Sequence, residues 1–199
     1  RVYYVSLDYG ISVDYRNVLT LCADDSNPVL VGALREAVEE WNAAISFFSA
    51  KYFWLFLLDG VRLEVTPPPC DVEVKLDSFN PEEKGYLAYA TKESIVMSDR
   101  IRPDKFAVVL MHEIAHVLGI GEAEVLRRPL IAGYEPAASA NRSTAVTSYD
   151  VYALYLCRRG WCDVAVPAYL PYQSTWDMSL DLLSLSASAA ISALWWWRR

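Results

Sequence analysis

The sequence predicts an α+β fold with a long packing helix and a shorter helix that carries the candidate site. Two observations lead to this class. Short runs rich in Val, Tyr, Leu and Ile are separated by turn residues, which is typical of strands. In other stretches the apolar residues recur every three or four positions, which is typical of helices. Because these two patterns interleave along the chain, the class is α/β or α+β, and we take α+β as the prediction.

The N-terminal part predicts two strands followed by the long helix. The strands are expected over residues 2–7 and 11–22. Asn27 is a side-chain cap, and Pro28 suits the first position of a helix. A single apolar stripe then predicts an amphipathic helix of about five or six turns, whose role is core packing. The stripe consists of Val31, Leu34, Val38, Trp41, Ile45 and Phe48.

The remaining elements follow from the same patterns. An apolar run over 52–58 ends at the turn signal Asp59-Gly60. Strands are expected over 61–65 and 71–76, an extended stretch over 86–97, a helix from Pro103 to about Leu118, and a helix over 147–156.

The chain length suits one domain with a short appendage. We place the domain at residues 1–164, a linker at 165–177 and a hydrophobic C-terminal tail at 178–199. Residues 165–177 contain two prolines and are interpreted as an extended linker. Residues 182–197 carry no charge and include three tryptophans, and Arg198-Arg199 follow. One interpretation of this tail is a membrane anchor, although sixteen residues are short of the roughly 20 that span a bilayer. The other is a C-terminal helix packed on the domain.

Charge and cysteine content limit the classes of binding partner and the cellular location that we expect. The net charge of −7, with no run of basic residues longer than two, argues against nucleic acid as a partner. The chain starts at Arg1, from which we expect a mature form. An extracellular or cell-surface protein is therefore expected, and in such a chain an even number of cysteines favours two disulfides. Of the three pairings we prefer Cys22 with Cys70 and Cys157 with Cys162; four reduced, buried thiols are the alternative.

The segment His112-Glu113-Ile114-Ala115-His116 carries the chemistry. Histidines four apart lie on one face of a helix, where both imidazoles can reach one zinc ion. Glu113 follows the first histidine, where it can hold and deprotonate the attacking water. A core helix that happens to contain two histidines is the alternative. It is disfavoured because the chain has only two histidines and both fall here, where imidazoles without polar partners would be costly.

The residues after the helix suggest a third ligand. Gly119 can leave the helix in a left-handed conformation, so the chain turns back and Glu122 can approach the metal. The pattern resembles the metzincin signature H-E-x-x-H-x-x-G-x-x-H, with Glu122 in place of the family's final His or Asp. Carboxylate oxygen is an accepted zinc ligand. Glu124 and Glu135 are alternative ligands, and Glu122 could instead be a solvated loop carboxylate.

Within the metzincins, residues 11–156 look most like the matrixin group, which includes the matrix metalloproteases. Leu87-Ala88-Tyr89-Ala90 is similar to the family's L-A-H-A edge strand, which pairs with the substrate backbone; an ordinary strand is the alternative. In the family's Met-containing turn, Leu130 stands where the Met forms an apolar floor below the metal. Tyr134 stands at the turn's final Tyr and would wall a substrate pocket. Residues 147–154 resemble the family's closing helix L-S-x-D-x-x-x-L.

The resemblance implies a metzincin-like catalytic domain with a twisted mixed sheet, a Zn²⁺ cofactor and a peptide or protein substrate. The expected activity is a zinc endopeptidase in which His112, His116 and Glu122 hold the metal and Glu113 is the general base. A gluzincin-like or other zinc hydrolase with a different third ligand is one alternative. A non-catalytic cell-surface domain that keeps the fold is another, although an intact Glu113 argues against it.

Overall fold

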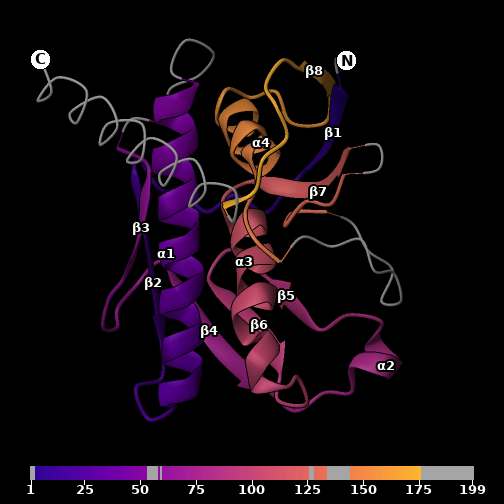
Figure 1. Ribbon diagram of the computed structural model, residues 1–199. Helices are drawn as coiled ribbons and strands as arrows, with labels where there is room; N and C mark the ends of the chain where they lie inside the picture. Colours follow the sequence, from indigo (N-terminus) through magenta and orange to yellow (C-terminus); the bar gives the residue numbers. More distant parts are fainter. Residues whose placement is uncertain (1–2, 53–57, 59, 126–127, 134–143, 176–199) are drawn as a thin grey trace, which may run out of the picture.

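The computed structural model describes residues 3–52, 58, 60–125, 128–133 and 144–175, and it has the predicted α+β class (Figure 1). Helices and strands interleave along the chain. The helices are α1 (Pro28–Lys51), α2 (Pro81–Lys84), the 3₁₀ turn η1 (Pro103–Lys105), α3 (Phe106–Val117) and α4 (Ser148–Arg158). The strands are β1 (Tyr3–Tyr9), β2 (Val18–Ala23), β3 (Arg62–Val65), β4 (Val72–Asp77), β5 (Ala88–Ala90), β6 (Ser94–Ser98), β7 (Ile120–Val125) and β8 (Ala165–Ala168).

The larger sheet has five strands in the order β3-β2-β4-β6-β5. β2 runs parallel to β3 and β4, and β4 runs parallel to β6. β5 pairs antiparallel with β6 and forms one edge. In Figure 1 the helices α1 and α3 lie in front of this mixed sheet, where α1 contacts β2 and β3 and α3 contacts β5 and β6. The sheet and the two helices form the platform for the candidate site.

The long helix α1 forms as its sequence predicts. The Asn27 side chain accepts a hydrogen bond from the N–H of Leu30 at 3.0 Å, and Pro28 occupies the first turn. Most of the predicted stripe, from Leu34 to Phe48, is buried. Trp41 is fully buried, and its Nε1 donates to the carbonyl of Met111 in α3 at 2.9 Å. The helix therefore packs directly on the element that carries the candidate site.

A second sheet was not predicted. It is antiparallel, in the order β7-β1-β8. Its outer strands have weak sequence signals, because β7 contains a glycine and two glutamates and β8 contains a proline. Within the predicted linker over 165–177, residues 165–168 form β8, which pairs with β1.

Two other predicted strands differ from the structure. The strand expected over 11–22 begins only at Val18, because the residues before it bond to the end of α3 instead. Gly10 N–H donates to the carbonyl of Gly119 at 3.1 Å, and Val13 N–H donates to that of Val117 at 2.9 Å. The stretch expected over 86–97 is a hairpin of β5 and β6. The predicted run over 52–58 lies mostly outside the described residues, and the tail over 178–199 lies wholly outside them.

The four cysteines form the two disulfides that the sequence favours, Cys22–Cys70 and Cys157–Cys162. Such bonds are typical of extracellular proteins. The first joins β2 to the residues before β4, and the second joins the end of α4 to the loop before β8. Among the helices of the described chain, none combines the length and apolar character that a membrane span requires. Anchoring by the tail stays a prediction.

Removing the Cys22–Cys70 bond should lower stability more than removing the Cys157–Cys162 bond. The Cys22–Cys70 bond closes a loop with a sequence separation of 48, and the Cys157–Cys162 bond closes one of 5. Removing the bond of the longer loop increases the entropy of the unfolded chain more, which stabilises the unfolded state. We expect losses of about 4 and about 2 kcal/mol in the free energy of unfolding. Chemical denaturation of the C22A/C70A and C157A/C162A double variants measures both. Equal or reversed losses would contradict this expectation.

Candidate metal centre

Helix α3 brings the two histidines and Glu113 into a largely buried setting. Spaced four apart on the helix, His112 and His116 have ring centroids 4.5 Å apart, and their Nε2 atoms lie 3.0 Å apart. His112 and Glu113 are each 5% exposed. The burial of His112 and Glu113 fits a site that excludes most water.

The chain reverses its direction at Gly119, which brings Glu122 close to the two histidines. Gly119 has a φ of +101°, a conformation that favours glycine, and the predicted left-handed exit from the helix is confirmed. The chain then continues as β7 along β1. Gly121 permits the close approach of these strands, since a Cβ there would lie 2.4 Å from the carbonyl oxygen of Asp8. As a result, Glu122 Oε1 lies 3.9 Å from His112 Nε2 and 3.7 Å from His116 Nε2.

Main-chain carbonyls orient both imidazole rings. His112 Nδ1 lies 2.7 Å from the carbonyl oxygen of Ile131, and His116 Nδ1 lies 3.0 Å from that of Ile120. A carbonyl oxygen can only accept a hydrogen bond, so each Nδ1 carries the hydrogen and donates. In a neutral ring the lone pair is then on Nε2. Each Nε2 then presents its lone pair on the side of the ring near Glu122 Oε1, as a metal ligand requires.

The donor set fits a zinc ion. The ligand atoms of His112, His116 and Glu122 all lie within 4.8 Å of one another, and within the described ranges no second such group of His, Cys, Asp or Glu occurs. Tetrahedral coordination with bonds of about 2.0–2.1 Å places ligand nitrogens about 3.3 Å apart, close to the 3.0 Å between the two Nε2 atoms. Two imidazoles and one carboxylate also leave a fourth position for water or substrate.

A buried carboxylate on α4 supports the loop below the histidines. Asp150 is fully buried and accepts hydrogen bonds from the N–H groups of Ile131 at 3.2 Å and Ala132 at 3.0 Å. Thr147 donates to it through both its N–H and its hydroxyl. Burial raises the pKa of Asp150, and the hydrogen bonds from Thr147, Ala132 and Ile131 oppose that shift. Asp150 thereby fixes the loop whose Ile131 carbonyl orients His112.

The other predicted site residues are placed as follows. Leu130 is buried in the same loop, and its role as an apolar floor stays a prediction. Glu124 is exposed and does not belong to the cluster. Tyr134 and Glu135 lie outside the described residues. The carbonyls of Ile120 and Ile131 carry no sequence signal, because every residue has a carbonyl. In the sequence, Asp150 stands out only as the Asp of the segment that resembles L-S-x-D-x-x-x-L.

The segment resembling the L-A-H-A strand forms β5 and the hairpin residue before it. Leu87 accepts from the N–H of Ser98, and Tyr89 pairs with Val96, so the main-chain groups of Leu87 and Tyr89 face β6. In an antiparallel ladder the alternate residues point the other way. The N–H and C=O groups of Ala88 and Ala90 therefore point away from β6, at the edge where no described strand pairs with β5.

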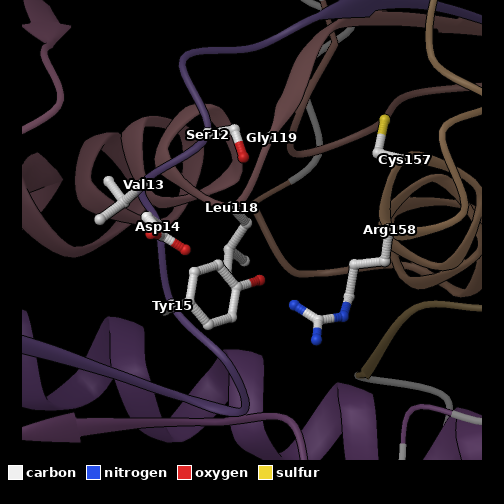
Figure 2. A pocket seen from close by; sticks show the side chains of 8 residues that line it. All are labelled: Ser12, Val13, Asp14, Tyr15, Leu118, Gly119, Cys157 and Arg158. Carbon is white, nitrogen blue, oxygen red and sulfur yellow. The ribbon is translucent and has the colours of Figure 1, made fainter.

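A cavity of ≈ 370 Å³ that the sequence does not predict is lined by residues 12–15, by Leu118 and Gly119, and by Cys157 and Arg158 of α4 (Figure 2). Arg158 crosses it, donates from Nη2 to the carbonyl of Arg16 at 2.6 Å, and lies 5.0 Å from the ring centroid of Tyr15. Burial raises the pKa of Tyr15, while Arg158 opposes that shift. Residues 10–13 bond to the end of α3, and Arg158 bonds to Arg16 a few residues later. The segment 10–16 therefore connects the end of α3 with the end of α4.

Compared with known proteins, the chain matches no family model and no curated sequence.

Proposed function

We propose that this chain is a zinc-dependent endopeptidase of the metzincin kind, similar to the matrixins. The observation that carries the proposal is the convergence of His112 Nε2, His116 Nε2 and Glu122 Oε1, with both Nδ1 atoms held by carbonyls. Helical spacing alone explains the proximity of the histidines. It does not explain a carboxylate from β7, an orienting carbonyl at the start of that same strand and a second orienting carbonyl from loop 128–133.

The architecture agrees with the resemblance. The Gly119 turn has the conformation that the metzincin signature needs, and the segment similar to L-A-H-A forms an edge strand. The helix similar to L-S-x-D-x-x-x-L is α4, whose Asp150 supports the loop containing Leu130. These features favour Glu122 over Glu124 as the third ligand, because Glu124 lies outside the cluster.

Each residue then has a defined role. Bound zinc would act as a Lewis acid that polarises the scissile carbonyl and makes water easier to deprotonate. Glu113 takes the proton of the attacking water and passes it to the nitrogen of the leaving amine. Burial of Glu113 keeps bulk water from competing for that proton. The carbonyls of Ile131 and Ile120 hold the imidazole rings in one tautomer throughout.

The substrate is an extended peptide that adds antiparallel to the edge of β5. Ala88 and Ala90 offer the main-chain donors and acceptors for this pairing. A substrate residue opposite Tyr89 would place its side chain on the same outward face as Tyr89. There the exposed Tyr89 ring forms an aromatic cluster with the half-buried Phe79, at 6.3 Å, and the exposed Tyr86, at 5.7 Å.

Removal and return of zinc tests the proposal. The full chain loaded with one equivalent of Zn²⁺ should cleave an unfolded protein, and a chelator should abolish cleavage because the carbonyl is no longer polarised. Restored zinc should restore activity, and gel analysis with mass spectrometry identifies the cleaved bonds. A chain that binds zinc but cleaves nothing would contradict the proposed activity and favour the non-catalytic alternative. A chain that binds no zinc would contradict the metal centre itself.

A further inference from the structure

The chain between β8 and the end of the described residues is fastened to two helices. Ser148 N–H donates to the carbonyl of Gln173 at 2.8 Å, and Gln173 N–H donates to Ser148 Oγ at 3.0 Å. On the other side, Lys51 Nζ and Tyr52 Oη lie 2.7 and 2.9 Å from Gln173 Oε1. Residues 170–175, which we call the C-terminal strap, are therefore held between α4 and the end of α1.

Tyr172 extends from this strap to the loop that supports the metal centre. Its hydroxyl donates to the carbonyl of Pro129 at 2.7 Å. The guanidinium of Arg128 lies 5.1 Å from the ring centroid of Tyr172 and 5.6 Å from that of Tyr3, within range of cation–π attraction. The Tyr172 ring also meets the ring of Tyr149 on α4 at 5.5 Å. Tyr172 therefore contacts both residues at the start of loop 128–133.

The same loop determines the orientation of His112. Two residues after Pro129, the carbonyl of Ile131 accepts from His112 Nδ1 at 2.7 Å. Asp150 holds the middle of the loop through the N–H groups of Ile131 and Ala132, and Tyr172 holds its start. β7 also holds this loop, since Arg128 N–H donates to the carbonyl of Val125 at 3.0 Å and Ala123 N–H donates to that of Ala132 at 2.8 Å. Tyr172 adds a side-chain bond at Pro129, between these two main-chain contacts and two residues before the carbonyl that accepts from His112.

We propose that Tyr172 is a positioning residue of the metal centre, acting through Pro129 and the Ile131 carbonyl on His112. The inference rests on the proposed metal centre and assigns a role to a segment outside the resemblance to matrixins, which ends at residue 156. Tyr172 touches neither metal nor substrate. Its effect is to keep the Nδ1–H bond of His112, and hence the direction of Nε2, constant.

The chain contains a matched control for this role. Tyr152 Oη donates to the carbonyl of Pro167 in β8 at 3.0 Å, the same chemical pair as Tyr172 and Pro129. Both contacts fasten the C-terminal part of the domain, but the Tyr152 contact does not involve loop 128–133. Tyr172→Phe and Tyr152→Phe should therefore cost similar stability, while only the first should alter the metal centre.

Cobalt binding and amide exchange test the proposal on the full chain. In Tyr172→Phe we expect the Kd for Co²⁺ to rise roughly three- to tenfold, below the ~10–100-fold typical of a group that bonds a ligand directly. The visible Co²⁺ bands, which report ligand geometry, should shift. Hydrogen–deuterium exchange in residues 128–133 of the metal-free chain should become faster. Tyr152→Phe should show none of these three changes, and thermal unfolding confirms that both variants fold.

The outcomes separate this inference from the proposed function. Equal Co²⁺ affinity, spectrum and loop exchange in Tyr172→Phe and wild type would overturn the positioning role. Equal changes in both variants would also overturn it, because the effect would then be general destabilisation. If the wild type binds no Co²⁺, the proposal of a metal centre is contradicted. The coupling of Tyr172 to the loop is still tested in that case, and unchanged hydrogen–deuterium exchange of residues 128–133 in Tyr172→Phe would overturn it.

Discussion

Glu113→Gln is expected to bind zinc as the wild type does and to lose peptide hydrolysis by roughly 10²- to 10⁴-fold in kcat/KM. Glutamine has nearly the shape of glutamate, but its amide cannot take a proton from the attacking water. Glu113 is buried on α3 next to His112, so the substitution leaves all three metal donors in place. Initial rates on an unfolded protein substrate, with zinc content measured in parallel, give the comparison.

The control for this result is Glu124→Gln, which changes an exposed glutamate outside the donor cluster. It should leave both zinc content and activity unchanged. If Glu113→Gln retained most of the wild-type kcat/KM, Glu113 would not be the general base. If it lost zinc as well, Glu113 would support the metal rather than the proton transfer, and the assigned roles would have to be revised.

Glu122→Ala should raise the Kd for zinc by more than ~100-fold, beyond the range expected for a group that only orients a ligand. The reason is that Glu122 Oε1 lies beside both Nε2 atoms, at 3.9 and 3.7 Å, and among the described residues it is the carboxylate that joins them in the cluster. Two imidazoles on one helix would remain as a weaker, two-ligand site. Competition with a metal indicator measures the affinity.

Glu124→Ala is the matched substitution for this test, since it removes the same side chain two positions further along β7. Its Kd for zinc should equal that of the wild type. If Glu124→Ala lost zinc affinity and Glu122→Ala did not, Glu124 would be the third ligand in place of Glu122. Wild-type affinity in both would point to another carboxylate, with Glu135 the remaining alternative from the sequence.

The parts of this fold that the sequence predicts are those set by local patterns. The stripe of α1 and its Asn27–Pro28 start depend on residues within one helix, and the structure confirms both. The helix expected over 147–156 is α4, which the structure starts with a capping box of Thr147 and Asp150. The proximity of His112 and His116 follows from helical spacing alone, because residues four apart share a face.

The missed parts depend on contacts between distant segments. Residues 10–13 look like a strand but bond to the last turn of α3, which offers carbonyls without helical partners. β8 contains Pro167, and its pairing with β1 depends on the whole chain being folded. Tyr172 resembles any tyrosine in a proline-rich stretch, and only its 2.7 Å contact with Pro129 shows where it acts. Long-range hydrogen bonds of this kind have no periodic signal in a sequence.

The position of bound zinc tests the central claim most directly. Crystals of the zinc-loaded full chain, measured on both sides of the zinc absorption edge, should show one anomalous peak between His112 Nε2, His116 Nε2 and Glu122 Oε1. Zinc bound elsewhere, or a peak that does not contact both histidines, would contradict the account.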